Sequence, residues 1–573
     1  MKKRVKKIDF SCTKYGEMAD KFYNSGDYLS ALRFAYKQLQ MYGGSAEIYA
    51  RLADIYEGMS LNGSALKWWF RYLDVAEEDE LPDVYEGIAV NFLNLGNESQ
   101  AAYYYNRLVD ADDMLPEETK FDIAQAFSTR KQDNFRFLYP PRLADYSKEV
   151  DAGSRALKAG DCNKAIAEFD KVAKGAKDYA SAKEMQAVAY LLAGDSNNAE
   201  RICNELLEEY PESVRAQATL SAVYMEQGDT EKSYEIAKRL AARQQDDVDD
   251  LYKVATVCCE NELHEEAYQK FCALYKKLPF DGRMLYFKAV SAYKSGHINE
   301  AENALDTLCT AYPDAEVAKY YLKAIRNYKE GVETQKPELI YFYHIPQSER
   351  EIRCKELLHI SQAPKDEAEL FGLIAVHEGY LYWCFDELDG GDHDLQYLAI
   401  VTAAHVRADE FLEDILLDPE VMDVLKVEAL RMLLERNEEN VFGIVLCNIY
   451  KRIVLPRINI GRKARKRFIE GFAKIASKFI AIHDSYGYKI KSATETLYRS
   501  LEKNGCWDLI KNADDCACAV YLLSELKELG GNISMIAAAF EADEQRVKEA
   551  LAVVRGESFQ KDSEENAEEE KGV

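Results

Sequence analysis

Proline and glycine are scarce in this chain, which has 12 prolines and 29 glycines among its 573 residues. Both residue types interrupt helices, so their scarcity favours long helices over short strands and turns. No segment approaches the roughly 18 consecutive apolar residues that a membrane-spanning helix needs. The basic start, MKKRVKKIDFSC, is followed by no apolar run of signal-peptide length. We therefore expect a helical protein without a membrane span.

Basic residues are also few relative to acidic ones: the chain has 73 Lys and Arg and 100 Asp and Glu, which gives a formal net charge of −27. Such a charge argues against nucleic-acid or anionic-lipid binding along the whole chain. The 13 cysteines are odd in number and lack the spacing of a disulfide framework. They indicate reduced thiols and a cytoplasmic location. The 47% apolar residues are enough to fill a large core.

The motifs of common catalytic sites are missing: there is no GxxxxGK(S/T) loop, no GxGxxG after a strand, no GxSxG and no HExxH. We predict that the protein is not an enzyme and uses no cofactor. An acidic loop and a group of cysteines leave metal binding open (Asp386, Asp389, Asp392, His393 and Asp394; Cys506, Cys516 and Cys518). Neither group has the spacing of a calcium loop or a zinc site, which favours a solvated loop and buried small residues.

A period of 34 residues runs through the middle of the chain. One column of this period holds only small residues (Ala165, Ala199, Ser233, Ala267 and Ala301). Twelve residues before each of them stands another small residue (Gly153, Ala187, Ser221, Ala255 and Ala289). Between the two columns lies a glycine in four of the five blocks, and Glu262 in the other. Each block therefore predicts two antiparallel helices that approach closely at the small residues and turn at the glycine.

This pattern resembles the tetratricopeptide repeat. Residues 12–115 continue it more loosely, with Ala19, Ala53 and Ala89 in one column and Ala31, Ala65 and Ala101 in the other. The resemblance covers about residues 12–328 and implies an all-α fold, an α-solenoid of about eight helix pairs. A second, mostly helical domain follows it. Since no block can bury its apolar face alone, the blocks must stack.

The sequence predicts seven segments. They are an N-terminal lobe of three repeats (1–115), a connector (116–145), a lobe of five repeats with a capping helix (146–331), an inter-domain connector (332–349), a helical domain (350–515), a helix-turn-helix-like unit (516–555) and an acidic tail (556–573). The break at 129–145 is a hinge or a rigid connector. The connector 332–349 holds an aromatic stretch between Pro337 and Pro346 that can be extended and packed. In the helical domain, one part resembles HEAT repeats, and a segment rich in β-branched residues near 441–460 favours a small hairpin.

The family resemblance implies that the first helix of each repeat lines a concave groove that holds a peptide or helix of a partner protein. At these positions the N-terminal lobe carries carboxylates (Asp20, Glu47, Asp54, Glu57, Asp83 and Glu86). The last two full repeats carry tyrosines and cations (Tyr252, Arg283, Tyr286, Tyr293 and Lys294). We expect a scaffold whose partner segment places basic residues on the carboxylates and apolar residues on the tyrosines.

A basic patch supports an alternative function. No Asp or Glu occurs from 440 to 469, where eight cations gather (Lys451, Arg452, Arg457, Arg462, Lys463, Arg465, Lys466 and Arg467). Together with the helix-turn-helix-like unit, this patch could serve a nucleic-acid-associated regulator. The second helix of that unit, at 544–551, is acidic and suits phosphate poorly. An ordinary basic surface, paired with the acidic tail, is the other interpretation.

Overall fold

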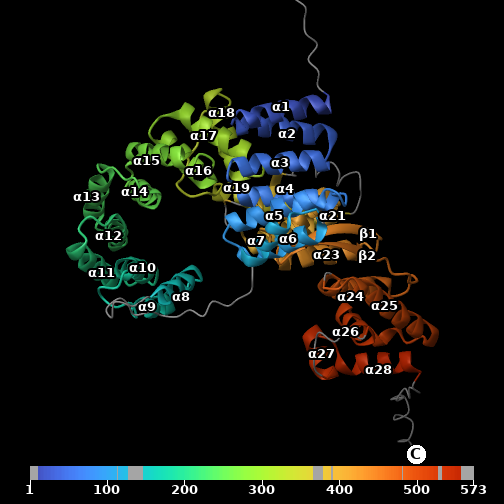
Figure 1. Cartoon of the computed structure of the whole chain (residues 1–573). Coiled ribbons are helices and arrows are strands. Elements are labelled where there is room, and N and C mark those ends of the chain that lie inside the picture. Colours follow the sequence, from blue (N-terminus) through green and yellow to red (C-terminus); the bar gives the residue numbers. More distant parts are fainter. Residues whose placement is uncertain are drawn as a thin grey trace, which may run out of the picture. The chain divides into compact units, whose positions relative to one another are not determined.

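The computed structural model describes residues 11–112, 114–126, 146–364, 379–386, 388, 391–480, 482–524, 526 and 532–556. The break at 129–145, Asp389 and residues 557–573 of the predicted tail lie outside them. The described part is predominantly helical, as the sequence predicts (Figure 1). Among these residues, no helix combines the length and the apolar character needed to cross a membrane.

The chain forms two compact units that interleave along the sequence. Unit 1 comprises Met1–Phe127, Gln347–Phe385 and Gly391–Val573, and unit 2 comprises Ser128–Pro346 and Asp386–Gly390. The boundary at Pro346 lies within the predicted inter-domain connector. The sequence does not foresee that the N-terminal repeats and the C-terminal helices belong to one unit.

Unit 2 is a curved solenoid of five helix pairs followed by one more helix. Its helices are α8 (Ser147–Lys158), α9 (Cys162–Phe169), α10 (Tyr179–Leu192), α11 (Ser196–Glu209), α12 (Val214–Gln227), α13 (Thr230–Ala241), α14 (Val248–Glu260), α15 (His264–Lys277), α16 (Gly282–Lys294), α17 (Ile298–Ala311) and α18 (Glu316–Lys329). In Figure 1, the first helices α10, α12 and α14 lie on the inner side of the arc, and the second helices α11 and α13 on its outer side.

The small residues of the repeat lie where the two helices of a pair meet. Ala199 and Ala187 are both fully buried, and so are their counterparts in the next blocks. In one block both positions are serines, and the hydroxyl oxygens of Ser221 and Ser233 are 2.8 Å apart. Because a larger side chain has no space there, the two columns set how closely the helices pack.

The turn within each pair explains the recurring Gly-Asp. Gly194 has a φ of +78°, in the left-handed region that glycine adopts without strain. The carboxylate of Asp195 then accepts a hydrogen bond from the backbone N–H of Asn198, and so caps α11. Glu262, which replaces glycine in one block, adopts the same left-handed conformation with a φ of +57°. The backbone turn is thus kept although the residue type changes.

Unit 1 begins with three helix pairs and one further helix: α1 (Cys12–Asn24), α2 (Tyr28–Tyr42), α3 (Ala46–Gly58), α4 (Asn62–Val75), α5 (Leu81–Asn94), α6 (Glu98–Ala111) and α7 (Glu117–Ala126). It continues with α19 (Gln347–Ser361), α21 (His393–Val406), α22 (Asp409–Leu417), α23 (Asp423–Glu435), β1 (Asn440–Leu446), β2 (Ile449–Leu455), α24 (Arg465–Phe479), α25 (Asp484–Asn504), the short 3-10 helix η2 (Trp507–Leu509), α26 (Ala513–Leu523), α27 (Ile533–Phe540) and α28 (Glu544–Arg555).

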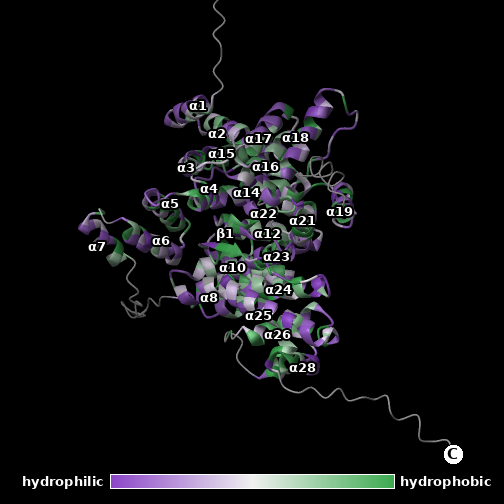
Figure 2. Ribbon diagram, turned by 90° about the vertical axis from the view of Figure 1, so that its right-hand side faces the viewer, coloured by the Kyte–Doolittle hydropathy of each residue, from purple (hydrophilic) through white to green (hydrophobic). Residues whose placement is uncertain are grey.

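The two strands form an antiparallel hairpin within the segment where the sequence favours one. Its turn consists of Cys447 and Asn448, which both have positive φ, at +51° and +61°. Two such residues match the twist of the flanking strands. β1 is largely hydrophobic (Figure 2), and Ile444 and Val445 are fully buried.

The hairpin and α22 pack against the second helices of the N-terminal repeats. The hydroxyl of Tyr104, on α6, donates to the backbone oxygen of Asn448 at 3.0 Å and accepts from the backbone N–H of Tyr450 at 3.1 Å. On α4, Lys67 pairs with Asp418 at 2.9 Å. These contacts leave the first helices α1, α3 and α5 to line the other side of the N-terminal repeats.

Candidate functional site

The predicted carboxylates of the N-terminal repeats lie on α1, α3 and α5, and we call them the acidic face (Asp20, Glu47, Asp54, Glu57, Asp83 and Glu86). All are exposed except Glu57, which is half-buried. Asp83 and Glu86 stand on α5, whereas Asp20 on α1 and Glu47 on α3 are brought together by one arginine. Arg51 donates to Asp20 at 2.6 Å and to Glu47 at 2.9 Å. No pattern in the sequence indicates this role of Arg51.

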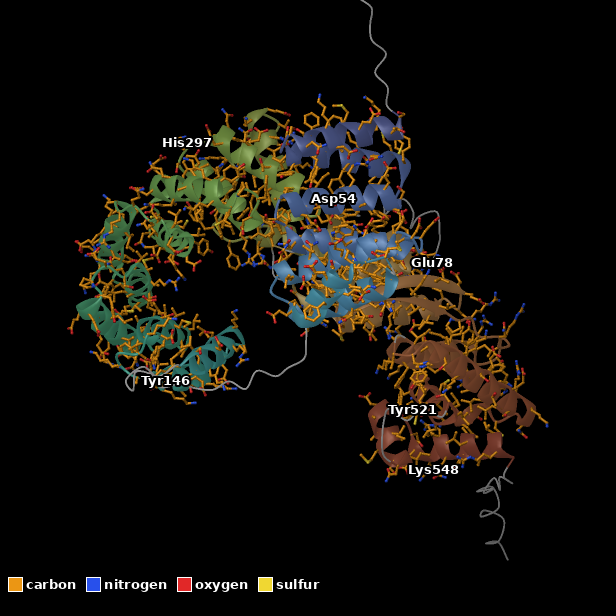
Figure 3. The ribbon with its side chains drawn as sticks, in the orientation of Figure 1. Asp54, Glu78, Tyr146, His297, Tyr521 and Lys548 are labelled. Atoms are coloured by element: carbon orange, nitrogen blue, oxygen red, sulfur yellow. The ribbon has the colours of Figure 1, made fainter. Side chains whose placement is uncertain are left out.

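Asp54 is the carboxylate most affected by its surroundings, and it lies near the middle of α3 (Figure 3). Its pKa is raised to about 6, mainly because neighbouring groups reduce the hydration of the carboxylate, although the side chain keeps an exposed surface. The negative charge of Glu57 adds to this shift, and Arg51 opposes it. A bound cation would therefore favour the ionised form of Asp54.

Glu57 has a structural task as well. One of its carboxylate oxygens accepts hydrogen bonds from the indole N–H of Trp69 at 2.7 Å and from the side-chain amide of Asn91 at 2.5 Å. Since Asn91 belongs to α5, Glu57 connects two successive repeats. It is therefore less available to a partner than Asp20 or Asp54.

Tyr286 and Tyr293 of the last repeats are buried by the chain itself, which corrects their prediction as exposed groove residues, whereas Lys294 is half-buried. Tyr286 is fully buried and Tyr293 is 3% exposed. The chain itself covers Tyr286 with residues 339–345 of the connector, which we call the groove segment. Lys294 lies with its ammonium group 5.7 Å from the ring centre of Tyr341 in this segment. The physical reason is that the aromatic connector turns back and buries its own apolar side chains.

Tyr252 and Arg283 are less buried than Tyr286 and Tyr293. Tyr252, on α14, is half-buried, and Arg283, at the start of α16, is exposed. Burial raises the pKa of Tyr252, and the nearby charge of Arg283 opposes this shift. These two side chains therefore stay at the edge of the covered surface.

The basic patch is spread over β2, the loop after it and the start of α24. Several of its cations are held by the chain's own backbone oxygens: Lys451 by Ile482 at 3.2 Å, Arg465 by Ile460 at 2.9 Å, and Arg467 by Trp507 at 3.1 Å. Five side chains are exposed (Arg452, Arg457, Arg462, Lys463 and Lys466). The patch is thus partly a structural feature and partly a basic surface.

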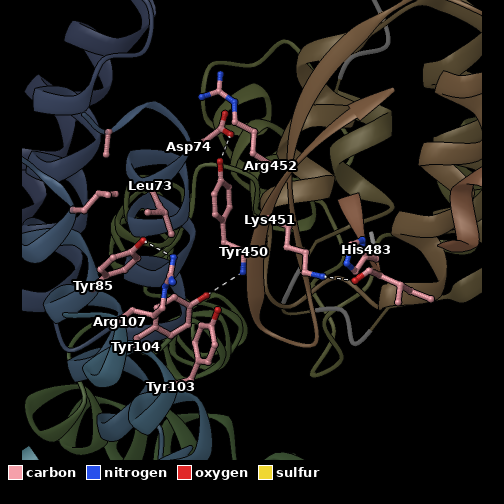
Figure 4. A pocket seen from close by; sticks show the side chains of 13 residues that line it. Leu73, Asp74, Tyr85, Tyr103, Tyr104, Arg107, Tyr450, Lys451, Arg452 and His483 are labelled. Carbon is pink, nitrogen blue, oxygen red and sulfur yellow. Dashed lines mark hydrogen bonds between the residues drawn. The ribbon is translucent and has the colours of Figure 1, made fainter. Parts of the chain in front are cut away.

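Two cations of this patch also line a pocket of about 570 Å³ within unit 1 (Figure 4). Lys451 and Arg452 stand on the hairpin side, and Tyr85 and Arg107 on the side of the N-terminal repeats. Arg107 donates to the hydroxyl of Tyr85 at 3.4 Å. Asp74 accepts from the hydroxyl of Tyr450 at 2.7 Å. The pocket therefore carries three cations beside one carboxylate.

Comparison with known proteins agrees with the repeat geometry. Residues 190–256 match the family model described as "Tetratricopeptide repeat". The chain carries tetratricopeptide repeats. Such repeats generally mediate binding between proteins.

Solved structures are also similar, at low identity. The structure of the P58(IPK) TPR domain is 14% identical, with a TM-score of 0.21, over 64% of this chain and 98% of that chain. The structure of yeast Tom70 is 12% identical, with a TM-score of 0.20, over 96% of this chain and 97% of that chain. In the complex of Cut9 and Hcn1, the matched chain is 13% identical, with a TM-score of 0.22, over 95% of this chain and 96% of that chain. No curated protein sequence matches this chain.

The segment for which the sequence predicts a helix-turn-helix-like unit contains α27, α28 and most of α26. Glu541 occupies its turn in the left-handed conformation, at a φ of +58°. On α28, Arg546 pairs with the buried Asp515 at 3.0 Å, and Lys548 with Glu544 at 2.5 Å (Lys548 is labelled in Figure 3). Two of the three cations of this helix are therefore paired within the protein, and the third, Arg555, lies exposed in its last turn. The paired cations are poorly available to phosphate.

Several residues of the acidic loop and of the cysteine group, which the sequence offers as possible metal ligands, have structural roles. Cys516 and Cys518 are buried, and desolvation raises their thiol pKa, for Cys518 to about 12. Asp386 is buried and accepts from the backbone N–H of Val317. Asp392 caps α21 and pairs with Arg350 at 2.6 Å. In the part of the chain that the structure describes, no group of three or more His, Cys, Asp or Glu is placed to hold a metal ion.

Proposed function

We propose that this protein is a non-enzymatic, cytoplasmic scaffold that binds a basic segment of a partner protein on its acidic face. The observation that carries the proposal is the group formed by Asp20, Glu47 and Asp54, three exposed carboxylates close to a single shared arginine. Like charges held together repel one another, and Lys or Arg of a partner would relieve this repulsion.

The raised pKa of Asp54 agrees with the same proposal: desolvation is its main cause, the negative charges of Glu57 and Asp20 add to it, and a cation of a partner would favour the ionised carboxylate. Asp20 and Asp54 are both exposed, so that a ligand can reach them without rearrangement of the repeats. The second helices, by contrast, are covered in part by the hairpin and α22. The side of α1, α3 and α5 is therefore the surface that we assign to the partner.

The test uses a short fluorescent peptide of alternating Arg and Ser, with a Glu and Ser peptide as its counterpart. We expect the full chain to bind the Arg peptide, and the triple variant Asp20→Asn, Asp54→Asn, Glu86→Gln to bind it about tenfold more weakly, since each lost charge pair contributes up to about 1 kcal/mol. The matched control is Glu208→Gln, Glu231→Gln, Glu235→Gln, which removes three exposed carboxylates from α11 and α13. Equal loss in both variants would reduce the effect to net charge and refute the proposal.

A further inference from the structure

The groove segment follows the pattern of a bound peptide. It has no regular secondary structure and is bent at residues 341–344. Leu339 is 1% exposed, Tyr343 7% and Ile345 5%, whereas Phe342 between them is 61% exposed. Tyr341 is half-buried, as are Ile340 and His344. The backbone N–H of His344 donates to the oxygen of Phe342 at 2.8 Å, so the segment turns there and is not a regular strand. It nevertheless inserts Leu339, Tyr343 and Ile345 into the surface on which it lies.

The repeats hold the backbone of this segment through tyrosine hydroxyls. Tyr286, on α16, donates to the oxygens of Ile340 at 3.0 Å and of Phe342 at 3.1 Å. Tyr321, on α18, donates to the oxygen of His344 at 2.7 Å. Backbone oxygens are present in every peptide, so these contacts fix the path of the segment, and the inward side chains supply the selectivity.

Two inward tyrosines occupy specific places. The ring of Tyr343 packs edge-on against that of Tyr286, with 4.8 Å between ring centres, and its hydroxyl donates to buried Asp386 at 3.1 Å. The hydroxyl of Tyr341 lies 3.1 Å from a ring nitrogen of His264 on α15. An aromatic ring with a polar tip therefore fits both places better than an aliphatic side chain.

The residues that link α18 to the groove segment are more exposed than the groove segment itself. Residues 331–336 are all exposed, and Gly331 has a φ of +73°. The segment can therefore leave the repeats without unwinding α18. As a tethered ligand it competes with any partner at an effective concentration on the order of millimolar.

We infer that α16 and α18, together with the start of α15, form a second peptide-binding groove, which the chain keeps closed with its own groove segment. The ligand that this groove takes is a peptide without regular secondary structure whose aromatic and branched aliphatic side chains fill the places of Leu339, Tyr341, Tyr343 and Ile345. A partner segment of this kind binds when it displaces residues 339–345. This inference is independent of the acidic face, because it concerns unit 2 alone.

The test compares the full chain with a release variant, Leu339→Ser, Tyr341→Ser, Tyr343→Ser, Ile345→Ser. The probe is a fluorescent peptide of residues 336–347. We expect the release variant to bind this probe at least tenfold more tightly than the wild type does, because its groove is open. A probe that carries serine at the four inward positions should not bind. A probe with Phe342→Ser should bind as well as the original, since Phe342 points outward.

A second variant keeps the inference testable if the release variant loses its helical circular dichroism. Tyr343→Ser alone should increase proteolysis within 332–346 and tighten probe binding severalfold. A folded variant that binds the probe no better than the wild type would overturn the inference. Binding of the Arg and Ser peptide should be the same in the wild type and both variants, so that failure here is separate from failure of the acidic face.

Discussion

Asp54 shows how one carboxylate can make both stability and binding depend on pH. An ordinary aspartate has a pKa near 4, whereas that of Asp54 is about 6 in the folded protein. Between these two values the folded protein keeps a proton that the unfolded chain has released. The stability that this residue contributes therefore falls as the pH rises from about 4 to about 6. Because Asp54 is exposed, solvent screening limits the effect to less than about 1 kcal/mol.

Binding of a basic peptide should show the opposite trend. We expect the Arg and Ser peptide to bind several-fold more tightly at pH 7.5 than at pH 5, because Asp54 becomes charged in between. In the variant Asp54→Asn most of this change should disappear. Fluorescence anisotropy at a series of pH values measures both profiles. Parallel profiles for the variant and the wild type would show that another group titrates.

At the scale of the helix pair, a buried small residue of the repeat tolerates less added volume than an exposed residue of the same helix. Ala199, on α11, is fully buried where the pair closes, and Glu208 on the same helix is exposed. A close-packed interior resists added volume, whereas an exposed position accepts it. The same substitution should therefore have very different consequences at these two positions.

We predict that Ala199→Leu lowers the free energy of unfolding by about 1–3 kcal/mol, because the extra atoms must push α10 and α11 apart. Glu208→Leu, the control on the same helix, should change it by less than about 0.5 kcal/mol. Urea unfolding followed by circular dichroism measures both. Similar values for the two variants would mean that the column at 199 does not set the helix spacing.

The helix pairs were predictable because everything that defines them is local. A turn glycine, its capping aspartate and two small residues lie within one block of 34 residues, and the pattern then recurs. No local pattern in the sequence indicates that Tyr286 is covered, because Ile340, to whose backbone oxygen it donates, lies 54 residues away. The sequence indicates that the stretch between Pro337 and Pro346 can pack, but not against which helices.

At the scale of the whole molecule, unit 1 joins parts from both ends of the chain. Tyr104 is 1% exposed, and its hydroxyl donates a hydrogen bond to the backbone oxygen of Asn448 and accepts one from the backbone N–H of Tyr450. These contacts have no periodic signal in the sequence, because a tyrosine hydroxyl can pair with any backbone group. The division of the chain into consecutive segments therefore missed the association of the N-terminal repeats with the hairpin.

Tyr104→Phe should reveal how much this association contributes. Removal of the hydroxyl leaves a partly buried N–H and a partly buried backbone oxygen without their partner, which costs about 1–3 kcal/mol. Tyr103→Phe is the matched control, because Tyr103 is the preceding residue of α6 and is 38% exposed. Hydrogen exchange should become faster in α6 and in the hairpin together. Faster exchange in only one of them would contradict a single cooperative unit.

The distance along the chain between these partners has a consequence for biosynthesis. Tyr104 and Tyr450 are 346 residues apart, and at about 5–20 residues per second a ribosome needs on the order of 20–70 seconds to make the intervening chain. During this time the outer surface of α4 and α6 has left the ribosome, while the hairpin that covers it does not yet exist. The nascent N-terminal repeats thus expose aromatic surface for tens of seconds, the situation in which molecular chaperones act.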